Sequence, residues 1–189
     1  MGREVELKFS ATPAVLKEIY SKWQNWEEIS MQTTYFDTAD GCLSAKHCTL
    51  RCRMENGISV CTMKTPTDGY GRGEWDTQTP WNEETAKKLF IAANREQIPF
   101  EKLLAVCGAR FTRLVKTVQL PDCTVEIALD QGVLLGGGKE IPLCEMEVEL
   151  KSGSEKAAVE WAGKLAAQYD LKAEHKSKFC RAAMLAQEA

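Results

Sequence analysis

The chain has 189 residues, 44% of them hydrophobic, and a formal net charge of −3 at pH 7. A chain of this size buries a sizeable core and forms one domain, so we expect a single domain over residues 1–189. The mild net charge gives no reason to expect a nucleic-acid partner, and no apolar run approaches the roughly 20 residues that span a bilayer.

The start of the chain and its cysteines favour a cytoplasmic protein. The N-terminus enters a charged stretch directly, unlike a secretory signal peptide. The chain has eight cysteines, and no two of them have the C-x-x-C spacing of zinc sites. An even number allows a disulfide framework, but a chain of this length does not need one. We therefore expect reduced thiols, mostly as small core residues.

Taken in chain order, the pattern predicts helices where a capping residue precedes an apolar stripe and strands where polar and apolar residues alternate. Helices are expected at residues 12–23, 82–94, about 100–107, 154–169 and 177–187. Strands are expected at residues 2–9, 29–37, 48–55, 58–65, 72–79, 109–119, 123–130 and 143–151. Asn56-Gly57 predicts a tight hairpin. Residues 132–142 read as a turn-rich connection in which a short strand is possible.

Charge is sorted by strand rather than mixed. The charged face of the first strand has Glu4, Glu6 and Lys8, and its apolar face has Val5, Leu7 and Phe9. Acidic residues alternate again in the last strand, whereas residues 50–54 alternate with arginines. A solvated face normally mixes the two signs to avoid like-charge neighbours, so sorted strands indicate an enclosed, charged interior.

These features predict the α+β class. The most economical architecture is an eight-stranded antiparallel closed β-barrel, a tunnel with a charged interior and helices packed outside. A sandwich with its charges on an outer, solvated face is the alternative.

The charged residues indicate phosphate chemistry. Six cations fall where alternation aims them inward: Lys8, Arg51, Arg53, Lys64, Arg72 and Arg113. Arg51 and Arg53 share a face about 7 Å apart, which suits two neighbouring phosphates. Confined cations repel one another unless a polyanion is present. Carboxylates beside a phosphate chain need a hard divalent cation, Mg²⁺ or Mn²⁺. Taken singly, each arginine can instead pair with a neighbouring acid.

The sequence resembles the CYTH superfamily, the triphosphate tunnel metalloenzymes. The shared segments are the E-x-E-x-K run at residues 4–8, the R-x-R strand at 51–53, the strand ending in Lys64, Arg72-Gly73-Glu74, residues 126–132, the alternating glutamates at 145–149 and Ser177-Lys178. They follow one another over nearly the whole chain. It looks most like the CYTH domain of bacterial inorganic triphosphatases, which have a helical CHAD domain after it. Such a domain is either absent here or has been cut away.

The resemblance implies hydrolysis of inorganic tripolyphosphate to pyrophosphate and phosphate in a tunnel, with Mg²⁺ or Mn²⁺. The metal ligands that it implies are Glu4, Glu6, Glu145 and Glu147, with Glu149 a weaker candidate. The implied substrate-binding residues are Lys8, Arg51, Arg53, Lys64, Arg72, Arg113 and Lys178, and the resemblance places Lys178 on a helix that plugs or lids the tunnel. The implied catalytic residues are Glu4, Glu6, Lys8 and Lys64. Glu126 and Asp130 would hold the basic residues or support the metal.

One departure from the family pattern affects a phosphate contact. Two positions after Arg113 the family usually has a second basic residue, and here that residue is Val115. Lys116 has the wrong parity to replace it unless a bulge intervenes.

Other activities stay open at this point. They are a class IV-type adenylate cyclase, a nucleoside or thiamine triphosphatase of the same fold, and a polyphosphate-binding module without turnover. An organic substrate would need a pocket at the tunnel mouth, where Trp26 and Trp75 are the first candidates to stack on a base. We expect no nucleic-acid or membrane partner and leave a homodimer open.

Overall fold

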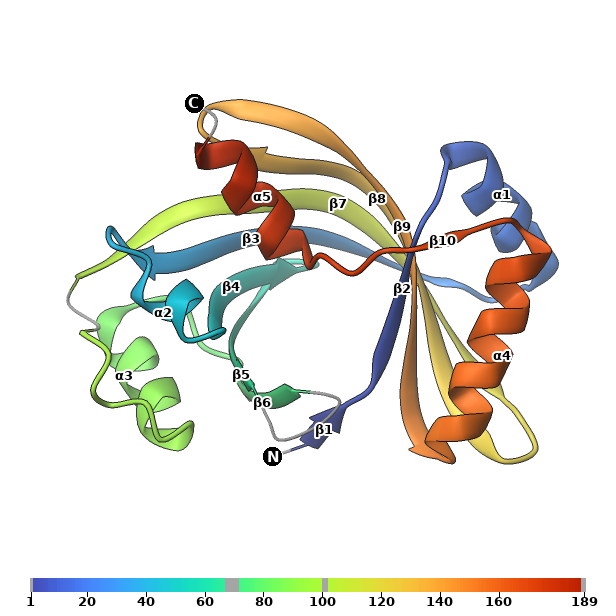
Figure 1. Ribbon diagram of the computed structural model, residues 1–189, viewed down its shortest axis with the longest axis horizontal. Coiled ribbons are helices and arrows are strands. Elements are labelled where there is room, and N and C mark those ends of the chain that lie inside the picture. The colour runs from blue at the N-terminus through green and yellow to red at the C-terminus, as the bar shows by residue number, and fades with distance from the viewer. Residues whose placement is uncertain (1, 67–71, 100–101, 188–189) are drawn as a thin grey trace.

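The computed structural model describes residues 2–66, 72–99 and 102–187. The side chains of residues 2–4 and of Arg72 lie outside that description. The described chain forms one antiparallel sheet with five helices (Figure 1). The predicted α+β class is confirmed.

The sheet is built from ten strand segments. They are β1 (Gly2–Glu4), β2 (Glu6–Ser10), β3 (Glu27–Thr38), β4 (Thr49–Glu55), β5 (Ile58–Pro66), β6 (Arg72–Thr77), β7 (Leu103–Gln119), β8 (Cys123–Gly136), β9 (Lys139–Gly153) and β10 (Lys172–Ala173). Their order across the sheet is β1-β6-β5-β4-β3-β7-β8-β9-β2-β10. Consecutive strands are neighbours from β3 to β6 and from β7 to β9, as in hairpin-connected antiparallel sheets.

The prediction of a closed, eight-stranded barrel is wrong. The ladder begins at β1 and ends at β10, and no pairing joins these two strands within the described residues. The sheet has nine strands even when β1 and β2, which only Val5 separates, are counted as one. β1 pairs with β6, whereas β2 pairs with β9 and with the short β10. The N-terminal stretch therefore contacts both sides of the curved sheet.

Two local predictions in the second half of the chain are also wrong. Residues from Leu103 onward were expected to be helical, but they begin β7 and pair with the end of β3. Residues 132–142 belong mostly to β8 and β9, which Gly137-Gly138 joins with positive φ angles of 57° and 74°. The glycines supply the backbone conformation of a tight hairpin, and long-range pairing overrides the local propensity of the flanking residues.

Four of the five described helices begin close to the predicted residues, whereas the short α2 (Cys42–Ala45) was not predicted. The five helices are α1 (Pro13–Lys22), α2, α3 (Glu83–Ala92), α4 (Glu155–Gln168) and α5 (Lys178–Gln187). The side chains of Thr12, Asn82 and Ser154 each accept a hydrogen bond from a backbone N–H of the first turn, which explains the starts of α1, α3 and α4. Among the residues that the structure describes, no helix is both long and apolar enough to cross a membrane.

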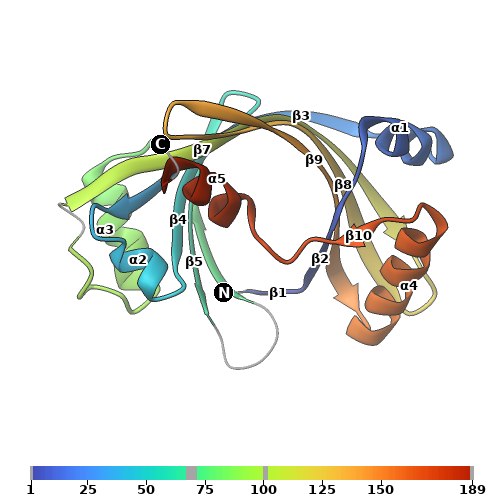
Figure 2. The ribbon, with the colours of Figure 1, turned by 45° about the horizontal axis from the view of Figure 1, so that its top comes forward.

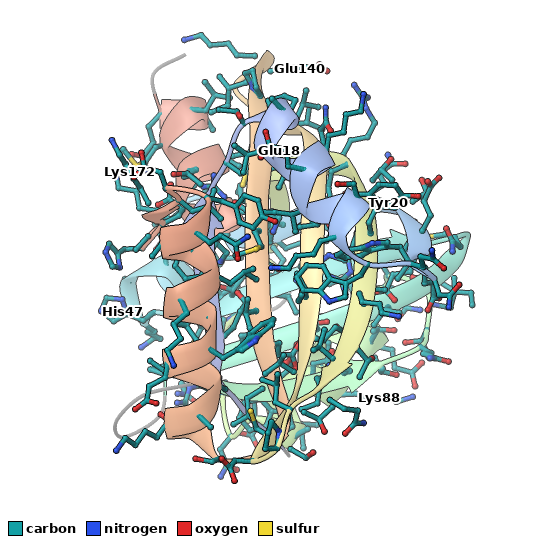
Figure 3. All side chains as sticks on the ribbon, turned by 90° about the vertical axis from the view of Figure 1, so that its right-hand side faces the viewer. Glu18, Tyr20, His47, Lys88, Glu140 and Lys172 are labelled. Atoms are coloured by element: carbon teal, nitrogen blue, oxygen red, sulfur yellow. The ribbon has the colours of Figure 1, made fainter. Side chains whose placement is uncertain are left out.

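Four helices cover the outside of the sheet. α1 and α4 pack on β2, β8 and β9 around a core that includes Ile19, Val148 and Ala162, and Figure 3 looks onto these two helices. α2 and α3 pack on β4 and β5 around Leu43, Leu50 and Phe90. The expected outer helix layer is present at both ends of the sheet.

The fifth helix lies on the inner side of the curved sheet (Figure 2). Ala182 of α5 packs against Ala109 and Phe111 of β7. Phe111 and Arg113 line a cavity, so this face of β7 is the inner one. The expectation of helices packed outside therefore does not hold for α5, whose apolar side is buried inside the curve, where the resemblance places the helix that bears Lys178.

Close packing of α5 on β8 can be tested at Gly136. A Cβ atom on this residue would lie 2.3 Å from the Ala182 carbonyl oxygen. We predict that Gly136→Ala pushes α5 away and lowers the free energy of unfolding by ~1–3 kcal/mol, because overpacking forces the backbone to shift. Chemical denaturation measures the loss, and hydrogen exchange should show faster opening of α5.

The matched control is Gly163→Ala in α4. Gly163 is exposed and no atom lies within 4 Å of its added Cβ. This change should raise stability by about 0.5–1 kcal/mol through helix propensity. Equal effects of the two substitutions would contradict the close approach of α5 to β8.

Candidate functional site

The inner side of the sheet encloses a cavity of about 1310 Å³. Strand alternation brings residues from β2 through β9 to it, and α5 lines one side. Its predicted cationic residues are Lys8, Arg51, Arg53, Lys64, Arg113 and Lys178. Its predicted acidic residues are Glu6, Glu147, Glu149 and Glu126. The structure thus brings most of the predicted site residues into one space.

Four predicted residues differ from this placement. Asp130 and Glu145 are fully buried behind the cavity wall instead of lining it. The side chains of Glu4 and Arg72 lie outside the described residues, although their backbones pair with each other between β1 and β6.

Lys116 does not supply the second basic residue that the family pattern has in β7 at the position of Val115. The pairing of β7 with β8 runs from Arg113 to Lys116 without a register shift, so there is no bulge here. Val115 lines the cavity and Lys116 does not. The apolar side chain therefore holds the position where the family pattern has a second cation.

Three carboxylates meet at the centre of the site. Asp130 of β8 is opposite Glu145 of β9, and Glu147 follows on the same face of β9. Each offers one oxygen atom, and these atoms lie within 4.8 Å of one another. Asp130 and Glu145 are fully buried, and Glu147 is 5% exposed. Burial of charges at this density requires compensating cations.

Lys178, the first residue of α5, supplies the central cation. Its Nζ atom lies 2.7 Å from Asp130 Oδ2 and 2.8 Å from Glu147 Oε1, and it also contacts Glu145. The resemblance implies a phosphate contact for Lys178, but in this structure its ammonium group fills the space between the three carboxylates.

Two arginines complete the ionic cluster. Arg113 donates through Nε and Nη2 to both oxygens of Asp130, at 2.8 and 2.7 Å, and it also contacts Glu147. Arg181 of α5 pairs with Glu145. Sequence reasoning missed Arg181, although it lies three residues after Lys178 and hence on the same side of the helix.

The pKa values follow from this pairing. Burial alone would lower the pKa of Lys178, but the surrounding carboxylates raise it above its usual value. Burial alone would raise the pKa of Glu147, but Lys178, Arg113 and Lys8 hold it well below its usual value. Burial and the neighbouring Glu147 raise the pKa of Glu145. The site therefore keeps Lys178 and Glu147 charged at neutral pH.

The opposite part of the cavity is basic. Arg51 and Arg53 of β4 and Lys64 of β5 line it. Arg51 and Lys64 share one carboxylate, Glu74, at 3.7 and 3.4 Å, and Arg53 pairs with Glu55.

One buried donor of this basic part lacks a partner among the described residues. It is the Nε atom of Arg51. Burial and the repulsion of Arg51 and Arg113 lower the pKa of Arg53 to about 10. A buried donor without a partner costs free energy unless a ligand accepts its hydrogen, so the arrangement favours a bound anion.

The cavity offers no tryptophan for a nucleobase. Trp26 donates its Nε1 hydrogen to the backbone oxygens of Tyr20 and Trp23 beside α1. Trp75 packs with the core under α3. Neither is among the described residues that line the cavity.

Known proteins match this sequence and fold. Residues 2–183 match the CYTH domain, and the chain belongs to that family. An inorganic triphosphatase of Haemophilus influenzae is 29% identical over 168 residues, which are 82% of this chain and 47% of that protein. The chain therefore spans about half the length of this curated relative.

Solved structures share the fold. One is a proposed adenylate cyclase of Bacillus halodurans, with a TM-score of 0.68, 18% identity and coverage of 94% of this chain and 96% of that chain. Another is a proposed adenylyl cyclase of Hippeastrum with a dominant triphosphatase activity, with a TM-score of 0.69, 14% identity and coverage of 97% and 96%. At these identities the likeness shows the fold alone.

Because Glu147 is ionised in the cluster, its contribution to the free energy of unfolding should depend on pH. The substitution Glu147→Gln should remove this contribution. A carboxyl group with a depressed native pKa stabilises the fold above its unfolded pKa of about 4.3, and this contribution is lost as the pH falls through the native pKa. We expect Glu147→Gln to cost about 3–5 kcal/mol at pH 7, because it leaves buried cations uncompensated. The cost should shrink steadily below about pH 4.3.

Urea unfolding of both proteins from pH 7 to pH 2 measures this difference. The control is Glu140→Gln, since Glu140 pairs with Arg110 at the surface and is 52% exposed. That change should cost less than about 1 kcal/mol at any pH. A cost for Glu147→Gln that stays constant with pH would contradict the ionised pairing.

Proposed function

We propose that this CYTH domain hydrolyses inorganic tripolyphosphate to pyrophosphate and phosphate, with Mg²⁺ or Mn²⁺ as cofactor. One observation supports it above the others. On one side the cavity is lined by Arg51, whose buried Nε atom has no partner among the described residues, and on the other by Glu147, behind which Asp130 and Glu145 are buried. A phosphate chain accompanied by a divalent cation satisfies both sides at once.

The basic side suits a linear chain of phosphates. Arg51 and Arg53 are alternate residues of β4, so their side chains leave the strand about 7 Å apart. Each guanidinium group can grip one phosphate in a planar fork, and Lys64 adds a point charge. Among the described residues neither Trp26 nor Trp75 lines the cavity, so the two candidates that the sequence suggested for stacking on a base do not serve there.

The acidic side suits a hard cation. Its donors are carboxylate oxygens, the ligands that Mg²⁺ and Mn²⁺ prefer, and the ammonium group of Lys178 already shows that a cation fits between them. Asp130, Glu145 and Glu147 would hold the metal, and Glu6 and Glu149 line the adjoining cavity. When bound, the metal neutralises charge on the phosphates and acidifies a water molecule.

The chain itself contributes positioning and electrostatics. Lys8 lies on the acidic side of the cavity, with its Nζ atom 3.2 Å from Glu6 and 3.5 Å from Glu147. Burial would lower its pKa, but these two carboxylates raise it, so it stays a cation that can contact the substrate. Fixed charges around the transferred group stabilise the transition state without reorganisation, as expected for loose phosphoryl transfer.

Lys178 and the metal compete for the same oxygens. An ammonium group and a divalent ion about 4 Å apart repel each other by ~8 kcal/mol at an effective dielectric constant of 20. A metal held by Asp130, Glu145 and Glu147 would therefore exclude the ammonium group of Lys178, which also lines the cavity and would be free to contact a phosphate there. That would agree with the substrate role that the family implies for Lys178.

The activity is tested by phosphate release from tripolyphosphate, ATP and thiamine triphosphate, each with and without Mg²⁺ and Mn²⁺. We expect metal-dependent release from tripolyphosphate above all. Arg51→Gln should raise KM by about 10–100-fold, since a charge-assisted hydrogen bond contributes about 1.5–3 kcal/mol. Arg110→Gln, which removes a surface arginine that is 60% exposed, is the control and should leave the kinetics unchanged.

Other outcomes separate the alternatives. Cyclic AMP and pyrophosphate from ATP would favour a cyclase, and preferred hydrolysis of an organic triphosphate would show an unrecognised pocket. Tight binding of tripolyphosphate without hydrolysis would favour a binding module. The cytoplasmic location, the single-domain organisation and the homodimer stay predictions from the sequence.

The competition at Lys178 is tested by metal binding alone. We expect Lys178→Met to bind Mn²⁺ at least tenfold more tightly than the wild-type protein without substrate, because the competing ammonium group is gone. Isothermal titration calorimetry and the electron paramagnetic resonance signal of free Mn²⁺ measure the affinity. Lys176→Met removes the same charge from an exposed side chain two residues away. Equal Mn²⁺ affinities of the two variants would show that Lys178 does not occupy the metal position.

A further inference from the structure

Two cysteines lie opposite each other in the hairpin of β4 and β5. Cys52 and Cys61 are Cα partners in the antiparallel ladder. The hairpin turns through Asn56 and Gly57, whose φ angles of 48° and 87° define a two-residue turn with both central residues left-handed. Glu55 and Ile58 are therefore the hydrogen-bonded pair that closes the turn.

Alternation along the ladder then fixes the kind of pair that the cysteines form. Hydrogen-bonded and non-hydrogen-bonded pairs alternate from the closing pair, so Met54 with Ser59 is non-bonded and Arg53 with Val60 is bonded. The cysteines come next and form a non-hydrogen-bonded pair. The Cα atoms of such a pair lie about 4.5 Å apart, within the ~4.4–6.8 Å range of disulfides.

The surroundings make the two thiols unequal. Cys61 is fully buried, and its Sγ atom lies 3.4 Å from the Thr79 carbonyl oxygen. Cys52 is partly exposed, and its Sγ atom lies 3.2 Å from Ser59 Oγ. Burial, together with the neighbouring Cys52 thiol, raises the pKa of Cys61 to about 12. A reagent from solvent therefore meets Cys52 first.

We propose that Cys52 and Cys61 form a site of oxidative modification, at which a hydroperoxide joins them in a cross-strand disulfide. The Cys52 thiol takes one oxygen atom from the hydroperoxide, which leaves as an alcohol or as water, and becomes a sulfenic acid. The Cys61 sulfur attacks the Cys52 sulfur, the S–O bond breaks and water leaves. In total two thiols and one hydroperoxide give one disulfide, one alcohol or water from the peroxide, and one further water.

The disulfide leaves the cavity side of the hairpin intact. Cys52 alternates with Arg51 and Arg53, so its side chain leaves β4 on the face opposite to the cavity that the arginines line. The new bond would join strands that are already paired in this register. We therefore expect modification to stabilise the hairpin, whatever the enzyme's substrate is.

The test exposes the reduced, full-length chain to hydrogen peroxide and analyses it under non-reducing conditions. Trypsin cleaves after Arg51, Arg53 and Lys64, so the disulfide would hold the dipeptide Cys52-Arg53 on the peptide of residues 54–64. Mass spectrometry should find this linked species two hydrogen masses below the sum of its parts, and dithiothreitol should release it. The melting temperature of the oxidised protein should rise.

Two variants make the test specific. Cys61→Ser should stop the reaction at the sulfenic acid of Cys52, which dimedone traps as an adduct. Cys123→Ser, which removes a buried cysteine of β8, should leave the linked species unchanged. The proposal is overturned if the wild-type protein gives no linked species while its other thiols are oxidised, or if dimedone labels Cys52 equally in the wild-type and Cys61→Ser proteins.

Discussion

The ammonium group of Lys178 between three buried carboxylates is the interaction on which the site depends. It joins the first residue of α5 to the middle of β8 and β9. Without it, Asp130, Glu145 and Glu147 would be like charges in a space that excludes water, and such an arrangement does not persist. With it, and with Arg113 and Arg181, the sheet can place negative charge inside the fold and α5 is held against the inner face.

The same cluster explains why the cavity has two chemically different sides. The cations of α5 and β7 form ion pairs with the buried carboxylates of β8 and β9. In contrast, Arg51 of β4 and Lys64 of β5 pair with a single carboxylate, that of Glu74. The division follows from the chain, because β8 and β9 supply the acids and the β4–β5 hairpin supplies the bases. A ligand with both a negative chain and a metal fits this division, and a simple anion would satisfy only one side.

Strand alternation predicted much of the site because its period is exact and the sorting of charge by strand is rare. It placed Lys8, Arg51, Arg53 and Arg113 on the side that lines the cavity. It did not predict how the sheet ends, since a two-residue strand such as β10 has no period to detect. It also failed from Leu103 onward, where pairing with β3 decides the structure. Arg181 was missed because its partner, Glu145, is 36 residues away in the chain.

The division of the N-terminal stretch at Val5 has a consequence for how this protein is made. Glu6 of β2 pairs with Glu149, so β2 gains its partner β9 only after most of the sheet has been synthesised. Until then Leu7 and Phe9 lack Val148 and Met146, the residues opposite them in the ladder. Contacts between such distant parts of a chain slow folding, because the entropy of closing the loop is lost before the pairing is gained. During synthesis β2 therefore keeps an unpaired edge for a long time and needs protection from aggregation.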